Sequence, residues 1–375
     1  MKELFSGVAL GKNFNAKNRL VRSSTWEGLC DCDGYVTPAL CKMYEELAQG
    51  GVGTIVTGIT YVERGDQPSR NMMGLDDDCF IPNCKKLCDV VHKHDCRLVV
   101  QLGAGGSMSH YKTDLRRVYA PSSHPDSTMY EGAEEITRAE IETLIQNYAA
   151  ACVRAKKAGF DAIQIHAAHG FLISQFFEPR FNWRNDEYGG SLENRARFLF
   201  EIYDAARAAV GEEYPIWIKI NCEDFMGSEG LLFEEARWIC TQLATRGIDL
   251  IEISGGNCNT TKLELGPMRS NIKTVDDEGY FLSQAEIIAE DVDVPVMSVG
   301  GYRSVQKMQE TLAKTKIEMI AMCRPLICEP DLPNRMREGT QDRASCFSCL
   351  DLRCKKIYGG ECLYCRVQRL KRGKA

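Results

Sequence analysis

The sequence lacks several features that would assign it to a broad class of proteins. No apolar run approaches the roughly 20 residues that cross a bilayer, and the start, MKELFSGVALGKNFNAKNRL, has no long apolar region like that of a signal peptide. Positive charge is not in excess, because 46 Lys and Arg stand against 52 Asp and Glu, a net charge of −6. These absences argue against a membrane protein and against nucleic acid as a partner, and they predict a cytoplasmic protein.

Histidine is scarce, whereas cysteine is plentiful. The chain has 6 His and 18 Cys. The cysteines do not have the spacings of a small secreted disulfide scaffold, and several, such as Cys152 and Cys240, fall in expected helices, where a reduced thiol packs as a small apolar group. Because histidine is rare, the pair His166 and His169 at the end of an apolar run indicates a site rather than core packing.

Short runs rich in β-branched residues recur along the chain, separated by longer stretches with helical character. Apolar strands that alternate with helices are typical of a parallel sheet covered by helices on both faces. Eight such runs predict an α/β fold, a closed TIM (β/α)8 barrel. The runs are 19–24, 53–60, 97–103, 161–168, 216–222, 250–256, 295–301 and 318–324.

A barrel with insertions accounts for most of this length. We expect it to occupy residues 1–340, followed by a short cysteine-rich C-terminal tail at 341–375. Residues 107–136 mix Gly, Ser, Pro and His without a clear period, so this insertion is expected to form a lid over the catalytic face.

Small and polar residues end the expected strands, at the face where barrels place their chemistry. The seventh run ends in Gly300 and Gly301, and the eighth in Arg324. The two glycines let backbone N–H groups approach an anion, and Arg324 offers a charged fork, so the pair of strand ends predicts a phosphate site. The alternative is a simple turn beside a salt bridge at the rim.

The stretch IQIHAAHGFLISQFFEPRFNWRNDEYGGSLENRARFLFE, residues 163–201, resembles the signature of the Old Yellow Enzyme family of FMN-dependent NADH:flavin oxidoreductases and ene-reductases. The chain looks like a short form related to the barrel domain of dienoyl-CoA reductase. The resemblance implies FMN as cofactor, NAD(P)H as electron donor and a small unsaturated molecule as substrate. It also implies that the histidine pair binds the substrate's carbonyl oxygen as an oxyanion-type donor pair. A structural pair, or two ligands of a metal that needs a third, are the alternatives.

The resemblance assigns further residues to the flavin. Gln101 would offer a donor and an acceptor to the pyrimidine edge, and Lys219 would stabilise negative charge on the reduced ring. The alternatives are a polar layer inside the barrel for Gln101 and a buried ion pair with Glu252 or Asp224 for Lys219. The expected cofactor-binding residues are Ser24, Thr25, Gly58, Gln101, His166, Lys219, Gly300, Gly301 and Arg324.

Three positions depart from the family's pattern. Phe171 stands where a tyrosine usually protonates the substrate, so Tyr111 in the lid, Tyr61 or water must supply the proton. Trp26 stands where Thr or Cys is common and is expected to reshape the pocket or point away, and Ala104 replaces a usual histidine. The expected catalytic residues are His166, His169 and Tyr111.

The tail suggests a metal site. Its cysteines include two C-x2-C pairs with twelve residues between them, a spacing that suits four thiolate ligands. Larger relatives carry a [4Fe–4S] cluster here, so the alternatives are a cluster, a zinc site or unligated thiols. The residues concerned are Cys346, Cys349, Cys354, Cys362 and Cys365.

Together these features predict an oxidoreductase that transfers hydride from NAD(P)H through FMN to an activated alkene. The alternatives are a flavin-dependent dehydrogenase or a nitro- or quinone reductase on the same fold, a metal-dependent lyase or hydrolase that uses the histidine pair, and a non-catalytic electron-transfer flavoprotein. The sequence leaves open the alkene, the choice between NADH and NADPH, and the oligomeric state, a homo-oligomer being one option.

Overall fold

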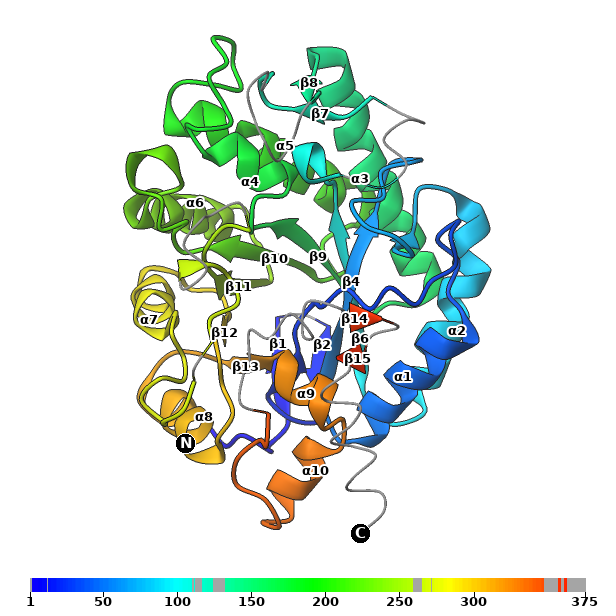
Figure 1. Cartoon of the computed structure of the whole chain (residues 1–375), viewed down its shortest axis with the longest axis vertical. Helices are drawn as coiled ribbons and strands as arrows, with labels where there is room; N and C mark the ends of the chain where they lie inside the picture. The colour runs from blue at the N-terminus through cyan, green and yellow to red at the C-terminus, as the bar shows by residue number, and fades with distance from the viewer. Residues whose placement is uncertain are drawn as a thin grey trace.

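The computed structural model describes residues 2–11, 13–109, 111, 117–123, 132–258, 265–270 and 272–346, and the short strands β14 (Ile357–Tyr358) and β15 (Glu361–Cys362). Parallel strands close into a barrel surrounded by helices (Figure 1). The barrel closes because β3 pairs with β4 on one side and with β13 on the other. The barrel strands are β3 (Leu20–Arg22), β4 (Thr54–Tyr61), β6 (Arg97–Gly103), β9 (Ala162–Ala167), β10 (Ile216–Asn221), β11 (Leu250–Ser254), β12 (Val296–Val299) and β13 (Met319–Met322).

Each of the eight expected runs overlaps one barrel strand, so the predicted TIM barrel is confirmed. Helix starts follow local capping rules: Thr137 accepts the N–H of Glu140, whose side chain accepts the N–H of Thr137 in return. The helices are α1 (Pro38–Gln49), α2 (Ile81–His92), α3 (Arg138–Ala158), α4 (Leu172–Phe177), α5 (Leu192–Val210), α6 (Phe233–Thr245), α7 (Leu282–Asp291), α8 (Val305–Lys314), α9 (Arg324–Cys328) and α10 (Leu332–Arg337). In the described part of the chain, no helix is both long and apolar enough to cross a membrane.

An N-terminal hairpin closes the bottom of the barrel. Strands β1 (Val8–Leu10) and β2 (Phe14–Ala16) pair antiparallel, and their inward residues join one buried cluster with side chains from inside the barrel. The ring of Phe14 meets the edge of Trp217 with centroids 4.7 Å apart. This hairpin therefore seals the end of the barrel opposite the site.

The inside of the barrel is built in layers, because residues two apart on a strand face the same side. The lowest layer is apolar and includes Val21, Val56, Val99, Ala162, Trp217, Leu250, Met297 and Met319. Two positions further along the chain from five of these residues, the side chains are polar and buried: Ser23, Gln101, Gln164, Lys219 and Glu252. The residues between these positions, such as Ile163 and Ile251, pack outward in the larger cluster that includes the helices. The polar layer thus lies directly above an apolar floor.

The lid and the tail lie only partly within the described residues. In the lid range 107–136, β7 (Tyr119–Ala120) pairs with β8 (Glu134–Glu135), and Ser109 donates to Asp66 at 2.8 Å. Of the tail cysteines, only the side chain of Cys346 is described; it is buried, and its N–H donates to Glu329 at 3.3 Å. The lid and the division at residue 340 stay predictions.

The floor of the barrel gives a stability prediction. Trp217 is fully buried, so Trp217→Ala should lower the free energy of unfolding by about 3–5 kcal/mol through the lost contacts and the cavity. The matched control is Trp183→Ala, because that side chain is 51% exposed and its loss should cost far less. Denaturant midpoints of the two variants measure the difference. Equal midpoints would show that the floor does not hold the barrel together.

Candidate active site

A row of hydrogen bonds crosses the polar layer of the barrel, just below its mouth, from the loop after β3 to β11. Ser24 Oγ donates to Gln101 Oε1 at 2.8 Å, and Gln101 Nε2 donates to Gln164 Oε1 at 2.7 Å. Gln164 Nε2 then donates to Glu252 Oε2 at 2.7 Å. Gln101 therefore lies in a polar layer, as one sequence interpretation held, and its side chain still faces the mouth through Ser24.

Glu252 is also the ion-pair partner of Lys219. Lys219 Nζ lies 2.9 Å from Glu252 Oε1 and donates to Ser23 Oγ at 2.8 Å, and Ser23 Oγ donates to Glu252 at 2.5 Å. The ion pair considered from the sequence is thus present with Glu252. Asp224, the other partner considered, instead accepts from Asn221 at 2.6 Å.

The histidine pair lies beside Lys219. His166 is opposite Lys219 in the register of β9 and β10, and its ring centroid is 5.4 Å from that of His169. His169 follows the strand with a φ of 65°, and its Nε2 lies 2.8 Å from Ser254 Oγ. Nδ1 of His166 is buried, and no described residue hydrogen-bonds to it. The sequence prediction that the two imidazoles meet at the mouth is consistent with this geometry.

Both imidazoles are held neutral. Burial first, and then the nearby Lys219 cation, lower the pKa of His166 to about 3. The same two causes, with a contribution from His166, lower the pKa of His169 well below its ordinary value. A neutral imidazole has one N–H donor and one acceptor nitrogen. The pair can therefore donate hydrogen bonds to a ligand oxygen without adding a second buried charge.

An apolar wall stands next to the histidines. The ring of Phe171 is 4.9 Å from that of His166 and belongs to a cluster with Ile59, Tyr61 and Met72. Trp26 packs on the same cluster, and its indole N–H donates to the carbonyl of Arg70 at 3.0 Å. Of the two expectations for Trp26, this geometry supports the one in which it reshapes the pocket.

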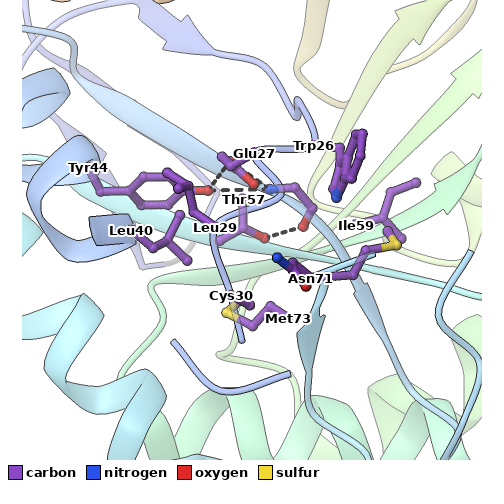
Figure 2. A pocket seen from close by; sticks show the side chains of 12 residues that line it. Trp26, Glu27, Leu29, Cys30, Leu40, Tyr44, Thr57, Ile59, Asn71 and Met73 are labelled. Atoms are coloured by element: carbon purple, nitrogen blue, oxygen red, sulfur yellow. Dashed lines mark hydrogen bonds between the residues drawn. The ribbon is translucent and has the colours of Figure 1, made fainter. Parts of the chain in front are cut away.

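A buried ionic cluster fixes the loop that carries Trp26. Arg22 and Glu27 form an ion pair at 3.0 Å, and the Tyr44 hydroxyl and the Gly58 N–H also donate to Glu27. Figure 2 shows Glu27 and Tyr44 pointing toward each other in the lining of a small pocket. A side chain at Gly58 would collide with the Glu27 carboxylate, so Gly58 has a packing role here. Its contact with a cofactor stays a prediction.

The glycines after β12 lie against an aromatic ring and near Arg324. Gly300 and Gly301 have φ of 144° and 79°, and a Cβ on Gly301 would lie 2.7 Å from the ring of Tyr280. Arg324 acts electrostatically on Tyr280, and its guanidinium donates to the Arg269 carbonyl at 2.7 Å. Tyr280 thus neighbours both glycines and is affected by Arg324, and the binding of a phosphate by these residues stays a prediction.

The two tyrosines considered as proton donors differ in their surroundings. The Tyr61 hydroxyl donates to the Asp33 carbonyl at 2.9 Å, and burial raises its pKa, so it is engaged away from the histidines. Tyr111 lies with its ring centroid 5.8 Å from the Arg70 guanidinium, and Arg70 also accepts the Trp26 indole N–H. Tyr111 is therefore linked to the apolar wall.

Two residues of the site were not singled out from the sequence. Gln164 joins Gln101 to Glu252, and it could have been found because it lies two positions before His166 on β9 and so faces the same side. Glu178 is buried and accepts from Asn257 at 2.7 Å; burial is the first cause that raises its pKa well above the ordinary value. The described residues include no group of three or more His, Cys, Asp or Glu that could hold a metal.

Comparison with known proteins identifies the family. The model of the NADH:flavin oxidoreductase / NADH oxidase family matches residues 3–343. The chain belongs to this family. As a family member, it is 31% identical to an NADPH dehydrogenase of Clostridium acetobutylicum over 85% of this chain and 90% of that protein. The family match confirms the resemblance to the Old Yellow Enzyme family.

Two longer proteins also resemble this family member. An NADH oxidase of Thermoanaerobacter brockii is 33% identical over 98% of this chain but only 58% of its own length. The solved structure of a 2-naphthoyl-CoA reductase in complex with 2-naphthoyl-CoA superposes with a TM-score of 0.82 at 27% identity, over 90% of this chain and 52% of that one. This chain thus spans little more than half the length of such relatives.

The neutral histidines give a pH prediction. The imidazole of His166 should not titrate between pH 8 and 5 when followed by NMR, because its pKa is about 3. The unfolded chain binds that proton near pH 6.5, so the free energy of unfolding should fall as the pH is lowered through this value. The same resonance in denatured protein is the control. A folded-state titration near pH 6.5 would contradict the burial of the pair.

Proposed function

We propose that this chain is an FMN-dependent oxidoreductase that reduces activated alkenes with electrons from NAD(P)H. The observation that carries the proposal is the neutral histidine pair at the barrel mouth beside Lys219, with a buried Nδ1 on His166 to which no described residue hydrogen-bonds. Two neutral N–H donors suit a carbonyl oxygen that gains negative charge during reduction. The Lys219 ammonium next to the pair disfavours a bound metal cation, which would repel it.

The residues at the mouth fit FMN. Gly300 and Gly301 both have a positive φ and lie against Tyr280, on which Arg324 acts electrostatically, so these residues would hold the phosphate. Gln101 and Lys219 would hold the pyrimidine edge of the ring, with hydrogen-bond donors of both neutral and charged kinds. FMN, when bound, would supply the two-electron chemistry that links a nicotinamide to an alkene.

The histidines would bind and polarise the substrate. Hydrogen bonds from His166 and His169 to the carbonyl oxygen withdraw electron density, which makes the β-carbon more electrophilic. Ser254 fixes the ring of His169 through its contact with Nε2 at 2.8 Å. The hydrogen bond from a fixed donor becomes stronger as the carbonyl oxygen gains negative charge. This arrangement would therefore lower the reaction barrier rather than only bind the ground state.

The proton for the α-carbon would come from Tyr111. Phe171 occupies the position beside His166 but has no hydroxyl, and Tyr61 donates its hydroxyl to Asp33. Tyr111 is tied to the same wall through Arg70, at 5.8 Å between guanidinium and ring centroid. It is therefore the described tyrosine that the arrangement favours as general acid.

The wall also bears on the acceptor. Trp26, Phe171, Ile59 and Met72 present aromatic and thioether surface beside the histidines. Such a wall favours flat, apolar acceptors over small polar ones. The bound ligand in the similar solved structure, 2-naphthoyl-CoA, has a flat aromatic group. Quinones are a second class of acceptor, because their reduction does not need a proton delivered to carbon.

Separate half-reactions test the function. The purified protein should bind FMN, NAD(P)H should bleach the flavin absorbance anaerobically, and an aryl enone should restore it. His166→Ala and His169→Ala should each slow reoxidation by the enone roughly 10²–10³-fold, the usual effect of one lost oxyanion donor, with a smaller effect on bleaching. His94→Ala is the control, because that ring contacts Glu45 of α1 instead. Parental reoxidation in both site variants would assign the pair a structural role.

The missing hydroxyl gives a second prediction. Tyr111→Phe should slow reduction of simple enones by roughly 10²-fold or more, the lower end for a general acid, and should leave quinone reduction unchanged. Adding Phe171→Tyr to that variant should restore much of the rate, because it places a hydroxyl beside His166. Stopped-flow reoxidation measures both. If Tyr111→Phe reduces simple enones at the native rate, the proton comes from water.

A further inference from the structure

We propose that Glu252 tunes the reduction potential of the flavin by opposing the charge of Lys219. This inference rests on the proposed function, because it requires FMN at the barrel mouth. It goes beyond that function, because it assigns a role to a residue that lies beneath the site and contacts neither substrate nor the phosphate cradle.

Every hydrogen bond that the described residues make with the Glu252 side chain is donated to it, an arrangement that suits a carboxylate. Gln164 donates to one oxygen at 2.7 Å, and Lys219 and Ser23 donate to the other at 2.9 and 2.5 Å. A carboxylate only accepts, so it satisfies all of these donors at once. The row from Ser24 through Gln101 and Gln164 runs in the same direction, with each donor pointing toward Glu252.

The position of Glu252 determines its effect on a ring above it. Both members of the pair are buried, since Glu252 is 0% and Lys219 is 3% exposed. Water therefore screens their fields weakly, and each charge acts strongly at short range. His166 and His169 add no charge because they are neutral. Lys219 thus meets its compensating anion directly below the mouth.

Reduction of the flavin adds negative charge to the ring. A bare Lys219 cation would stabilise that charge and raise the potential, whereas the Glu252 anion offsets this stabilisation. The native pair should therefore give a more strongly reducing flavin than Lys219 would give alone. A lower potential favours hydride delivery to poorly activated acceptors.

A purely structural role for Glu252 predicts something different. A buried ammonium without its partner is costly, so removing Glu252 should destabilise the fold in either case. Only the tuning role predicts a defined direction of change in potential. The potential, and not activity or stability, is therefore the decisive measurement.

The test uses the FMN-loaded protein equilibrated anaerobically with a reference dye. Glu252→Gln keeps the shape of the side chain and removes its charge. The ratio of reduced to oxidised flavin at a fixed dye potential should rise at least about tenfold, which equals about 30 mV for a two-electron couple. An unchanged or lower ratio would overturn the proposal.

Two further variants test whether the charge, and not a change in folding, shifts the potential. Lys219→Met should lower the ratio, and Lys219→Met combined with Glu252→Gln should return it toward the native value, because the pair is again neutral. The double variant also buries no unpaired charge, so it remains measurable if Glu252→Gln folds poorly. A double variant that stays at the Lys219→Met value would also overturn the proposal.

Asp249→Asn is the matched control. Asp249 precedes the same strand, β11, and pairs with Arg207 at the opposite end of the barrel. This variant loses a partly buried ion pair as well, so it should lose stability without a change in potential. If the native protein binds no FMN or reduces no alkene, the proposed function fails. If it does both and Glu252→Gln leaves the potential unchanged, only the tuning role fails.

Discussion

The strand residues of the candidate site are placed by one constraint, that alternate residues of a β-strand face the same side. In a closed barrel this sorts each strand into inward and outward residues. On β11 the inward series is Leu250, Glu252 and Ser254, and on β9 it is Ala162, Gln164 and His166. Each series runs from the apolar floor through the polar layer to the mouth. The floor holds the barrel together, and the layers above it carry the chemistry.

The polar layer persists because its charges and dipoles satisfy one another. A buried carboxylate is stable only if its partners replace the water it loses. Glu252 receives such partners from β9, from β10 and from the residue after β3, and this closes a network around Lys219. The same cation, together with burial, keeps the histidines neutral. Charge balance below the mouth therefore sets the donor chemistry at the mouth.

The departures from the family's pattern form one structural unit. Phe171 and Trp26 come from different strand ends and pack on one apolar cluster with Ile59. The loop carrying Trp26 is fixed from behind by the ion pair of Glu27 with Arg22. A lost hydroxyl and a larger indole thus change the same wall of the pocket. The acceptor, more than the cofactor, is where this chain is expected to differ from its relatives.

The sequence by itself determined the barrel and its eight strands, because β-branched runs at barrel spacing are a local pattern. It also determined at which end of the strands the site lies, because the histidine-containing signature is local too. It also indicated Gly300 with Arg324, since strand ends of a parallel barrel meet at one face. It could not decide between a flavin contact and an ion pair for Lys219, nor whether Trp26 faced the pocket. Those answers depend on contacts between residues far apart in the chain, such as Lys219 with Ser23 and Trp26 with Arg70. Only closure of the barrel brings such residues together, and burial there lowers the pKa values of His166 and His169.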